Sequence, residues 1–296
     1  ELISVDWKNE ENHNYFISQS IKKISPNKLN DFLQINKKKI DLIIHLGAIT
    51  STTEKNVDLI IENNLKLSIL LWNWCVKKRK RFIYASSAAT YGNGSEKFSD
   101  SDTKEYLHKL FPLNIYGWSK HIFDKFISKK KYQKIIPPQC VGMKFFNVYG
   151  PNENHKKEMR SIVLKTFQNI KKNKQVRLFK SHNPDFKDGE QLRDFIYVKD
   201  VVKIIEWFIN KPKISGLFNI GSGTPRSFND LVSAVFKNSN SEKKITYINT
   251  PKNIREQYQY FTCADMSKLK AKGYKKKTFS LEEGIKDYIT NHLNKE

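Results

Sequence analysis

Tyr116 and Lys120 are spaced for acid–base chemistry on an alcohol. Side chains four residues apart lie on one face of a helix, one turn from each other. A free tyrosine has a pKa of about 10, and a nearby ammonium favours the phenolate, so we expect Lys120 to lower the pKa of Tyr116. Such a pair could accept a hydroxyl proton while a hydride leaves the same carbon. Because Tyr-x3-Lys occurs often by chance, this interpretation depends on the rest of the chain.

Two blocks of sequence flank the Tyr-Lys pair, each about thirty residues away. YASSAATYG, residues 84–92, follows a hydrophobic run and carries hydroxyls where a strand is expected to end. KFFNVYGP, residues 144–151, lies on the other side. Open α/β sheets bind ligands beyond the carboxyl ends of their strands, so Ser86, Ser87 and Thr90 are well placed to contact a ligand. In this order the three blocks resemble the extended short-chain dehydrogenase/reductase family of nucleotide-sugar epimerases and dehydratases.

Apolar patterning in the first half of the chain predicts alternating helices and strands that would position these residues. The expected elements are a helix over 25–36, a strand over 40–50, a crossover helix over 57–78, a strand over 81–92, a helix over about 115–130 and a strand over 139–151. Ser25 is the expected N-cap of the first helix, with Pro26 at its first position. His45 lies inside an apolar run and is expected to be a hydrogen-bonded core histidine.

After Pro151 the pattern changes to shorter strands and amphipathic helices. The expected elements are a loop and helix over 153–174, a strand over 176–180, a strand running into a helix over 193–210, a strand and turn over 216–228, a helix over 227–237, a strand over 244–249, and helices within 257–274 and 280–293. Gly221 and Gly223 suit a tight turn that permits left-handed backbone. Ser280 is the expected N-cap of the last helix, with Glu283 at the third position.

The resemblance implies an α/β fold in two parts. The first is a Rossmann-like doubly wound parallel sheet, with its first strand missing from this sequence, over residues 1–147 and about 192–222. The second is a smaller C-terminal α/β substrate lobe over residues 148–191 and 223–296. A chain of 296 residues is long enough for either one large α/β domain or two such lobes.

The beginning of the chain lacks a phosphate-binding turn. ELISVD predicts a short strand ending at Asp6, and an acidic residue in that position accepts ribose hydroxyls in dinucleotide folds. The Gly-rich turn that should precede it is absent. We expect the natural gene to encode about 25–30 further residues with a strand and a G-x-x-G-x-x-G turn that opens a helix. The alternative is that Asp6 is a surface acid.

Within the family, the resemblance is strongest to a subfamily that acts on ADP-activated heptoses. It rests on HLGAITSTTE (45–54), PLNIYGWSKHIFD (112–124), FFNVYGPNENHKKEM (145–159), LRDFIYVKD (192–200) and QYQYFT (257–262). It implies an isomerase that inverts C6 of ADP-D-glycero-β-D-manno-heptose by transient oxidation with a bound nicotinamide cofactor. The product would supply heptose for the inner core of lipopolysaccharide. The resemblance also implies a homo-oligomer, a pentamer in many members.

Inversion through a ketone needs a proton-transfer group on each face of the carbon, unless the intermediate moves. By resemblance, Tyr116 is the first acid/base residue and Lys156 is the second. Lys120 matches the residue that binds the nicotinamide ribose and tunes the tyrosine. Ser87 matches the hydroxyl that bonds the reacting oxygen. A solvated loop lysine is the alternative for Lys156.

The resemblance also assigns cofactor and substrate residues. The cofactor set is Asp6, Leu46, Gly47, Ala48, Asn63, Lys120, Val148 and Lys156. The substrate set is Ser87, Asn147, Phe179, Arg193 and Tyr258. The family more often uses NADP, whereas the Asp6 carboxylate would repel a 2′-phosphate and favour NAD, so both cofactors stay open. The alternatives are a solvated polar residue for Asn63, a surface ion pair for Arg193 and a core aromatic for Tyr258.

Composition excludes several other classes of protein. Cys75, Cys140 and Cys263 fit neither a disulfide framework nor a metal site, so we expect no metal and a reducing cytoplasm. No apolar run could span a membrane, and no signal peptide is evident. The net charge of +23 comes from lysines spread along the chain. It predicts weak polyanion binding and no specific nucleic-acid partner, because no basic run interleaves with aromatics.

Two other functions remain open from the sequence. Another sugar-nucleotide enzyme, such as a UDP-hexose 4-epimerase or a 4,6-dehydratase, would share the three blocks. A dehydratase would want an acidic residue in the YASSAATYG block, which has none. A non-catalytic Rossmann protein that binds a dinucleotide or RNA would not need Tyr116, Lys120 and Ser87 together.

Overall fold

The computed structural model describes residues 1–6, 21–255 and 258–295. Its central sheet has four parallel strands in the order β3-β4-β5-β9. These strands are β3 (Leu42–His45), β4 (Arg81–Ser87), β5 (Cys140–Phe145) and β9 (Gly216–Ile220). The predicted α/β class with a Rossmann-like parallel sheet is confirmed.

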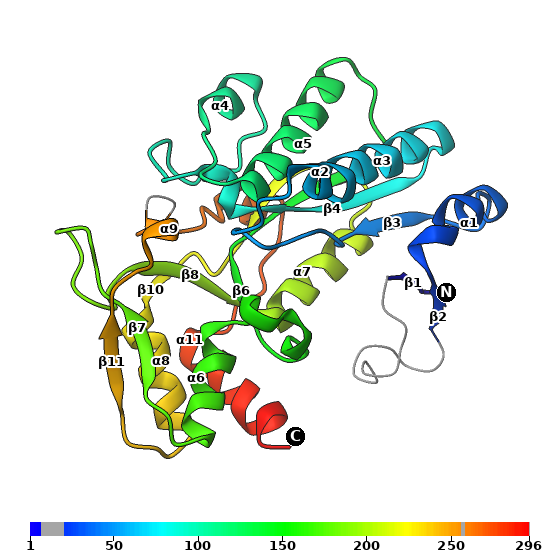
Figure 1. Cartoon of the computed structure of the whole chain (residues 1–296). Helices are drawn as coiled ribbons and strands as arrows, with labels where there is room; N and C mark the ends of the chain where they lie inside the picture. The colour runs from blue at the N-terminus through cyan, green and yellow to red at the C-terminus, as the bar shows by residue number, and fades with distance from the viewer. Residues whose placement is uncertain (7–20, 256–257, 296) are drawn as a thin grey trace.

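Helices cover both faces of this sheet (Figure 1). They are η1 (Pro26–Lys28), α1 (Leu29–Ile35), α2 (Val57–Ile60), α3 (Leu67–Lys78), α4 (Lys104–Lys109), α5 (Ile115–Tyr132) and α7 (Val198–Asn210). Successive residues of β4 point to opposite faces. Phe82 and Tyr84 pack in one core with side chains of α3 and α5, whereas Ile83 packs in another with side chains of α7. The sheet is therefore doubly wound.

The predicted crossover helix over 57–78 is present, with a π-helical segment, η2 (Ile61–Lys66), between α2 and α3. Such segments inside α-helices are often found at functional sites. This one contains Asn64, whose side chain is fully buried. The first predicted helix begins after Ser25 as expected, but the Ser25 side chain makes no capping hydrogen bond.

The predicted N-terminal strand is present and ends one residue before Asp6. β1 (Ile3–Val5) pairs in parallel with β2 (Lys22–Ile24) in a two-stranded sheet of its own. Asp6 follows β1, and its backbone N–H donates to the Ile24 carbonyl at 3.2 Å. The Asp6 side chain is exposed.

A second part of the chain lies beside the four-stranded sheet, at the lower left of Figure 1. Its strands form two small sheets, β10-β8-β6 and β11-β7. They are β6 (Asn147–Tyr149), β7 (Val176–Phe179), β8 (Leu192–Tyr197), β10 (Pro225–Ser227) and β11 (Ile245–Ile248). The helices after β6, apart from α7, are η4 (Asn154–Met159), α6 (Ile162–Lys171), α8 (Phe228–Asn238), α9 (Lys252–Arg255), α10 (Ser267–Ala271), α11 (Leu281–Tyr288) and η5 (Ile289–Leu293).

β8 contributes side chains to two of the three hydrophobic cores of the described residues. Ile196 packs with α7 beneath the central sheet, whereas Phe195 and Tyr197 pack with α6, α8 and α11. β8 also pairs with β6 and β10 and not with the central sheet. The expected two-part division at residue 192 therefore falls on a strand that belongs to both parts.

The closing segments differ from the prediction at one place. α11 has the predicted capping box of Ser280 and Glu283. The helix expected within 257–274 is confined to Ser267–Ala271. The chain before it runs beside β8 instead, because the Leu192 N–H donates to the Tyr260 carbonyl at 2.9 Å and the Thr262 N–H donates to the Leu192 carbonyl at 3.1 Å. Tertiary hydrogen bonds thus replace helical ones here.

Candidate active site

The first turn of α5 approaches the loop after β4 very closely. Asn114 is the N-cap, and its side chain accepts from the Gly117 N–H at 2.8 Å. A Cβ at Gly117 would lie 2.8 Å from the Ala89 carbonyl oxygen, so only glycine allows this contact. Ala89 belongs to η3 (Ala88–Tyr91), the short helix that directly follows Ser87. The close approach explains how Tyr116, next to Gly117, comes near Ser87.

The Ser87 hydroxyl lies close enough to the Tyr116 phenol to favour its charged form, which lowers the pKa of Tyr116. Ser87 ends β4 and caps η3, where its Oγ accepts from the Ala89 N–H at 3.1 Å. Its carbonyl accepts from the Thr90 hydroxyl at 2.7 Å. Ser87 therefore lies at the carboxyl end of a parallel strand, where such sheets bind ligands.

The pKa of Tyr116 departs from the expectation. Burial raises the pKa of Tyr116 above its usual value of 10.0, and the nearby Ser87 hydroxyl opposes this shift. The Lys120 ammonium does not lower it, contrary to the prediction, and donates to the Ala85 carbonyl at 3.0 Å. Burial lowers the pKa of Lys120 to about 8, against the opposing effect of Asp124. The Ser87 hydroxyl is the neighbour that favours the phenolate and lowers the pKa of Tyr116 in this structure.

The segment after β3 provides an open backbone surface. Leu46 is 45% exposed, and a Cβ built at Gly47 would meet no atom within 4 Å. Ala48 follows. His45, at the end of β3, is buried and bonded to the Ser68 hydroxyl at 2.9 Å, as predicted for a core histidine. The backbone at Leu46 and Gly47 is thus accessible to a flat ligand.

Asn64, which the sequence did not single out from Asn63, connects this segment to α5. Its side chain accepts from the Ile49 N–H at 2.8 Å, donates to the Ile49 carbonyl at 2.9 Å and donates to the Ser119 hydroxyl at 3.1 Å. Asn63 instead donates to the Leu59 carbonyl of its own helix. The π-helical turn gives Asn63 and Asn64 these different directions. The sequence pattern did not predict this turn.

Val148 and Lys156 line one cleft. It has a volume of about 610 Å³ and lies between the end of β6, η4 and the first turns of α7. Lys156 is exposed in η4. Its backbone N–H donates to the carbonyl of buried Glu153, whose carboxylate accepts from the Ser161 N–H and hydroxyl, both at 2.6 Å. Among the described residues, no hydrogen bond or ion pair joins Lys156 to Tyr116.

Phe179, Arg193 and Tyr258 come together in the second part of the chain. The Arg193 guanidinium lies 5.0 Å from the Tyr258 ring centre, and the Phe179 and Tyr258 rings meet edge to face at 6.2 Å. Arg193 is only 7% exposed. It donates to the Leu192 carbonyl, and no carboxylate of the described residues forms an ion pair with it. A buried guanidinium without an anion is a suitable site for a ligand phosphate.

Asp194, missed by the sequence analysis, holds the backbone around Arg193. Its buried carboxylate accepts from the Ser222 N–H at 2.6 Å, the Ser222 hydroxyl at 2.8 Å, the Gly223 N–H at 2.9 Å and the Ala264 N–H at 2.8 Å. Burial raises the pKa of Asp194. Gly223 has the left-handed φ of +75° that the turn requires. In the sequence Asp194 directly follows Arg193, and an acidic residue in that position could equally belong to a surface ion pair.

Residues 7–221 match the family model described as the NAD dependent epimerase/dehydratase family. The chain belongs to this family. It is 48% identical to an ADP-L-glycero-D-manno-heptose-6-epimerase of Fusobacterium nucleatum, over 88% of this chain and 80% of that protein. It is 45% identical to a protein of the same name from Nitratidesulfovibrio vulgaris, over 86% of this chain and 77% of that protein.

Solved structures of the NAD dependent epimerase/dehydratase family have the same fold. A crystal structure of Helicobacter pylori ADP-L-glycero-D-manno-heptose-6-epimerase matches with a TM-score of 0.74 and 30% identity, covering 92% of this chain and 80% of that chain. A Thermus thermophilus UDP-glucose 4-epimerase in complex with NAD matches with a TM-score of 0.75 and 19% identity, covering 94% of this chain and 86% of that chain. The second likeness concerns the fold alone.

The site fits the cofactor that the name of the epimerase/dehydratase family implies. The open backbone at Gly47 allows close approach of a ring, and Lys120 lies buried behind the end of β4. The described residues contain no cluster of side chains that could hold a metal ion. None of the described helices is long and apolar enough to cross a bilayer.

Proposed function

We propose that this protein is an ADP-L-glycero-D-manno-heptose 6-epimerase that inverts C6 of the heptose. The observation that carries the proposal is the close approach of α5 to the loop after β4, which brings Tyr116 near Ser87, in a chain 48% identical to a protein of that name. The pair supplies the proton-transfer group that oxidation of an alcohol needs. The product belongs to heptose supply for lipopolysaccharide. The three free cysteines suit a reducing cytoplasm.

The proposed mechanism assigns one residue to each face of C6. A bound nicotinamide would supply the acceptor and the donor of the C6 hydride. Tyr116 accepts the hydroxyl proton on one face, while Ser87 holds the same oxygen by a hydrogen bond. Lys156 supplies a proton on the opposite face. Lys120 holds its charge in a buried position, where it orients the cofactor ribose.

The proposed cofactor contacts come from the segments after β1 and β3 and from η2, α5, β6 and η4. They are Asp6, Leu46, Gly47, Ala48, Asn63, Lys120, Val148 and Lys156. Open backbone at Gly47 and the shared cleft of Val148 and Lys156 support this set. The cofactor is NADP or NAD. An exposed Asp6 carboxylate at the end of β1 favours NAD, because it would repel a 2′-phosphate.

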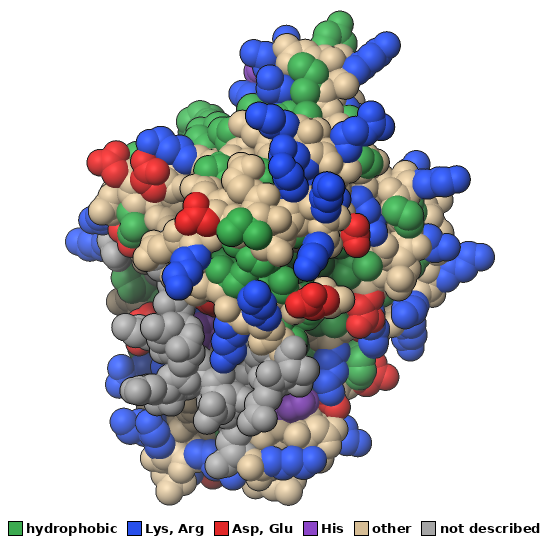
Figure 2. Space-filling view, turned by 90° about the vertical axis from the view of Figure 1, so that its right-hand side faces the viewer, with side chains coloured by type: hydrophobic (Ala, Val, Ile, Leu, Met, Phe, Trp, Pro, Cys, Tyr) green, Lys and Arg blue, Asp and Glu red, His purple; other side chains and the backbone are tan. Residues whose placement is uncertain are grey.

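The proposed substrate contacts divide between the reacting sugar and the ADP group. Ser87 and Asn147 lie at strand ends near the sugar. Phe179, Arg193 and Tyr258 form the ADP site, where the guanidinium binds the diphosphate and the aromatic rings pack on adenine. A positive surface would assist capture of this anionic substrate. On the face shown in Figure 2, Lys and Arg side chains are scattered among Asp and Glu and do not gather in one patch.

Ser87→Ala should shift the activity towards higher pH. The Ser87 hydroxyl stabilises the phenolate of Tyr116, so its loss disfavours the charged form and raises the tyrosine pKa further. The rising limb of kcat/KM against pH should therefore move to higher pH, with a lower rate at neutral pH. Ser128→Ala, on the same α5 but bonded to the Asp102 carbonyl, is the control. An unchanged profile in Ser87→Ala would contradict the assigned role.

Arg193→Gln should weaken substrate binding with little change in kcat. The substitution removes the charge that binds the diphosphate, and hydrogen bonds to charged groups contribute roughly 1.5–3 kcal/mol. KM should rise by roughly 10- to 100-fold. Arg226→Gln is a matched control, because Arg226 forms exposed ion pairs with Asp230 and Glu282 in the same part of the chain. Equal KM values for the Arg193 and Arg226 variants would contradict the ADP site.

The direct test is epimerisation of the named substrate. The protein encoded by the complete natural gene is purified, supplied with NADP or NAD and incubated with ADP-D-glycero-β-D-manno-heptose, and the two C6 epimers are separated by chromatography. Conversion to a mixture of both epimers supports the proposal. Conversion of UDP-hexoses instead would favour a 4-epimerase. Co-purification with RNA and no turnover of any sugar nucleotide would favour a binding protein.

A further inference from the structure

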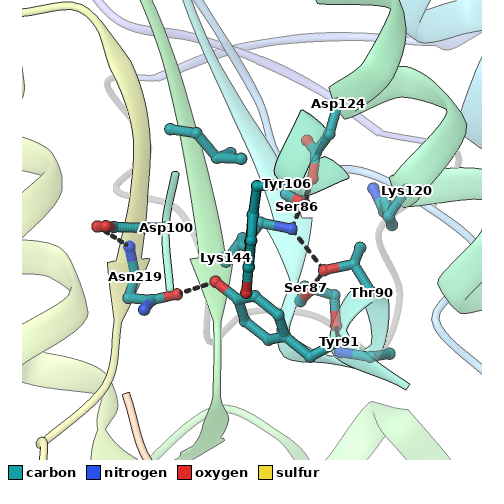
Figure 3. Close-up of polar contacts among 12 residues, drawn as sticks. Ser86, Ser87, Thr90, Tyr91, Asp100, Tyr106, Lys120, Asp124, Lys144 and Asn219 are labelled. Atoms are coloured by element: carbon teal, nitrogen blue, oxygen red, sulfur yellow. Dashed lines mark hydrogen bonds and ion pairs between the residues drawn. The ribbon is translucent and has the colours of Figure 1, made fainter. Parts of the chain in front are cut away.

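A wholly buried ion pair lies behind the candidate catalytic residues. Lys144, in β5, and Asp124, in α5, are 2.9 Å apart, and both side chains have no exposed surface. Removing two charges from water is costly, and a buried pair often stabilises a fold no more than apolar residues would. Retention of such a pair therefore calls for a role besides stability. Figure 3 shows that it sits between the loop after β4 and α5.

The Lys144 side chain is held by residues of η3, the short helix after β4. Its ammonium donates to the Thr90 hydroxyl at 2.5 Å and lies 4.6 Å from the centre of the Tyr91 ring. The Tyr91 hydroxyl donates to the Asn219 side chain of β9 at 2.6 Å (Figure 3). Thr90 in turn donates to the Ser87 carbonyl. The Lys144 ammonium therefore anchors η3 to β5 in the central sheet. Through Thr90 it also holds the backbone of Ser87.

The Asp124 carboxylate is held by hydroxyl groups of β4. Its carboxylate accepts from the Ser86 hydroxyl at 2.7 Å and from the Tyr84 hydroxyl at 3.1 Å. Asp124 lies one turn after Lys120 and two turns after Tyr116 on α5. Ser86 directly precedes Ser87. The carboxylate therefore joins the helix that carries Tyr116 to the strand that carries Ser87.

We propose that the Lys144–Asp124 pair positions the catalytic hydroxyls, by locking α5, β4 and η3 in the register that sets Ser87 against Tyr116. This inference rests on the proposed function, because it concerns the roles of Ser87 and Tyr116 there. Lys144 and Asp124 touch neither hydroxyl directly and are positioning residues. Charges and hydrogen bonds fix direction more strictly than apolar packing does, which suits a site where displacements of about 1 Å can cost about 100-fold in rate.

Lys144→Met should lower kcat by about 100-fold while KM and the retained cofactor change little. The substitution leaves Asp124 as a buried carboxylate without a cation, so the melting temperature should also fall. Thr90→Val keeps the volume and removes only the hydroxyl that Lys144 bonds. It should fold normally and lower kcat by about tenfold. Lys129→Met, which removes an exposed positive charge from α5, the helix that carries Asp124, is the control.

The double variant Asp124→Asn/Lys144→Met separates positioning from stability. It removes both charges, so the melting temperature should recover towards that of the parent, while kcat should stay at least tenfold low because Thr90 has lost its donor. Recovery of kcat together with stability would overturn the inference. So would a parental kcat in Thr90→Val. If the parent does not epimerise the heptose, or Tyr116→Phe is fully active, the proposed function fails first and separately.

Discussion

Tyr116→Phe is expected to stop net epimerisation, lowering kcat by at least about 10²–10⁴-fold. The change removes the phenolic oxygen and keeps the ring, so the packing of α5 against η3 is preserved. Without that oxygen no group on its face accepts the C6 hydroxyl proton, and water is a poor substitute at neutral pH. Cofactor should be retained, because the phenol is not its main anchor.

The measurement is the conversion of ADP-heptose with time, together with the cofactor released on denaturation. Tyr132→Phe is the matched control, because Tyr132 ends the same helix and is 91% exposed. It should behave as the parent does. Lys120→Met should differ from both, losing activity and cofactor together. Parental turnover in Tyr116→Phe would show that another group is the base and would remove the main support for the proposed reaction.

Much of the fold follows from apolar patterning. The runs before His45 and Ser87 predicted parallel strands because buried strands of such sheets are continuously hydrophobic. The ends of those strands then predicted where Ser87 would lie. The segment before Ser267 was wrongly predicted as helix, because its backbone bonds to β8 and no local pattern reveals a partner so far away in sequence.

The properties of the site that depend on charge and burial, such as the pKa of Tyr116, were harder to predict. Tyr116 and Lys120 have the predicted spacing, yet burial raises the pKa of Tyr116 and the ammonium bonds to Ala85. Spacing shows which groups can be neighbours but not how far each is removed from water. Lys144 illustrates the same limit, because a lysine in the sequence suggests a solvated surface whereas this one is wholly buried.

Lys156→Met should also block net epimerisation, and it tests the two-base mechanism most directly. The change removes the amine and keeps the length of the side chain. Lys156 is exposed in η4 on a cleft wall, and buried Glu153 fixes the start of its loop, so the fold should not depend on the amine. The loss should be at least about 10²-fold in kcat. Lys172→Met, at the exposed end of α6, is the control.

A 6-keto substrate analogue, given to protein loaded with the reduced cofactor as hydride donor, separates the two faces of the carbon. Each single variant has lost the proton donor of one face only, so Lys156→Met and Tyr116→Phe should each reduce the analogue to one epimer, and to opposite ones. The parent should give both. If Lys156→Met epimerises at close to the parental rate, Tyr116 serves both faces alone. The intermediate must then rotate within the site, because one fixed base cannot reach both positions of the hydroxyl, and a 4-epimerase type of mechanism becomes the better description.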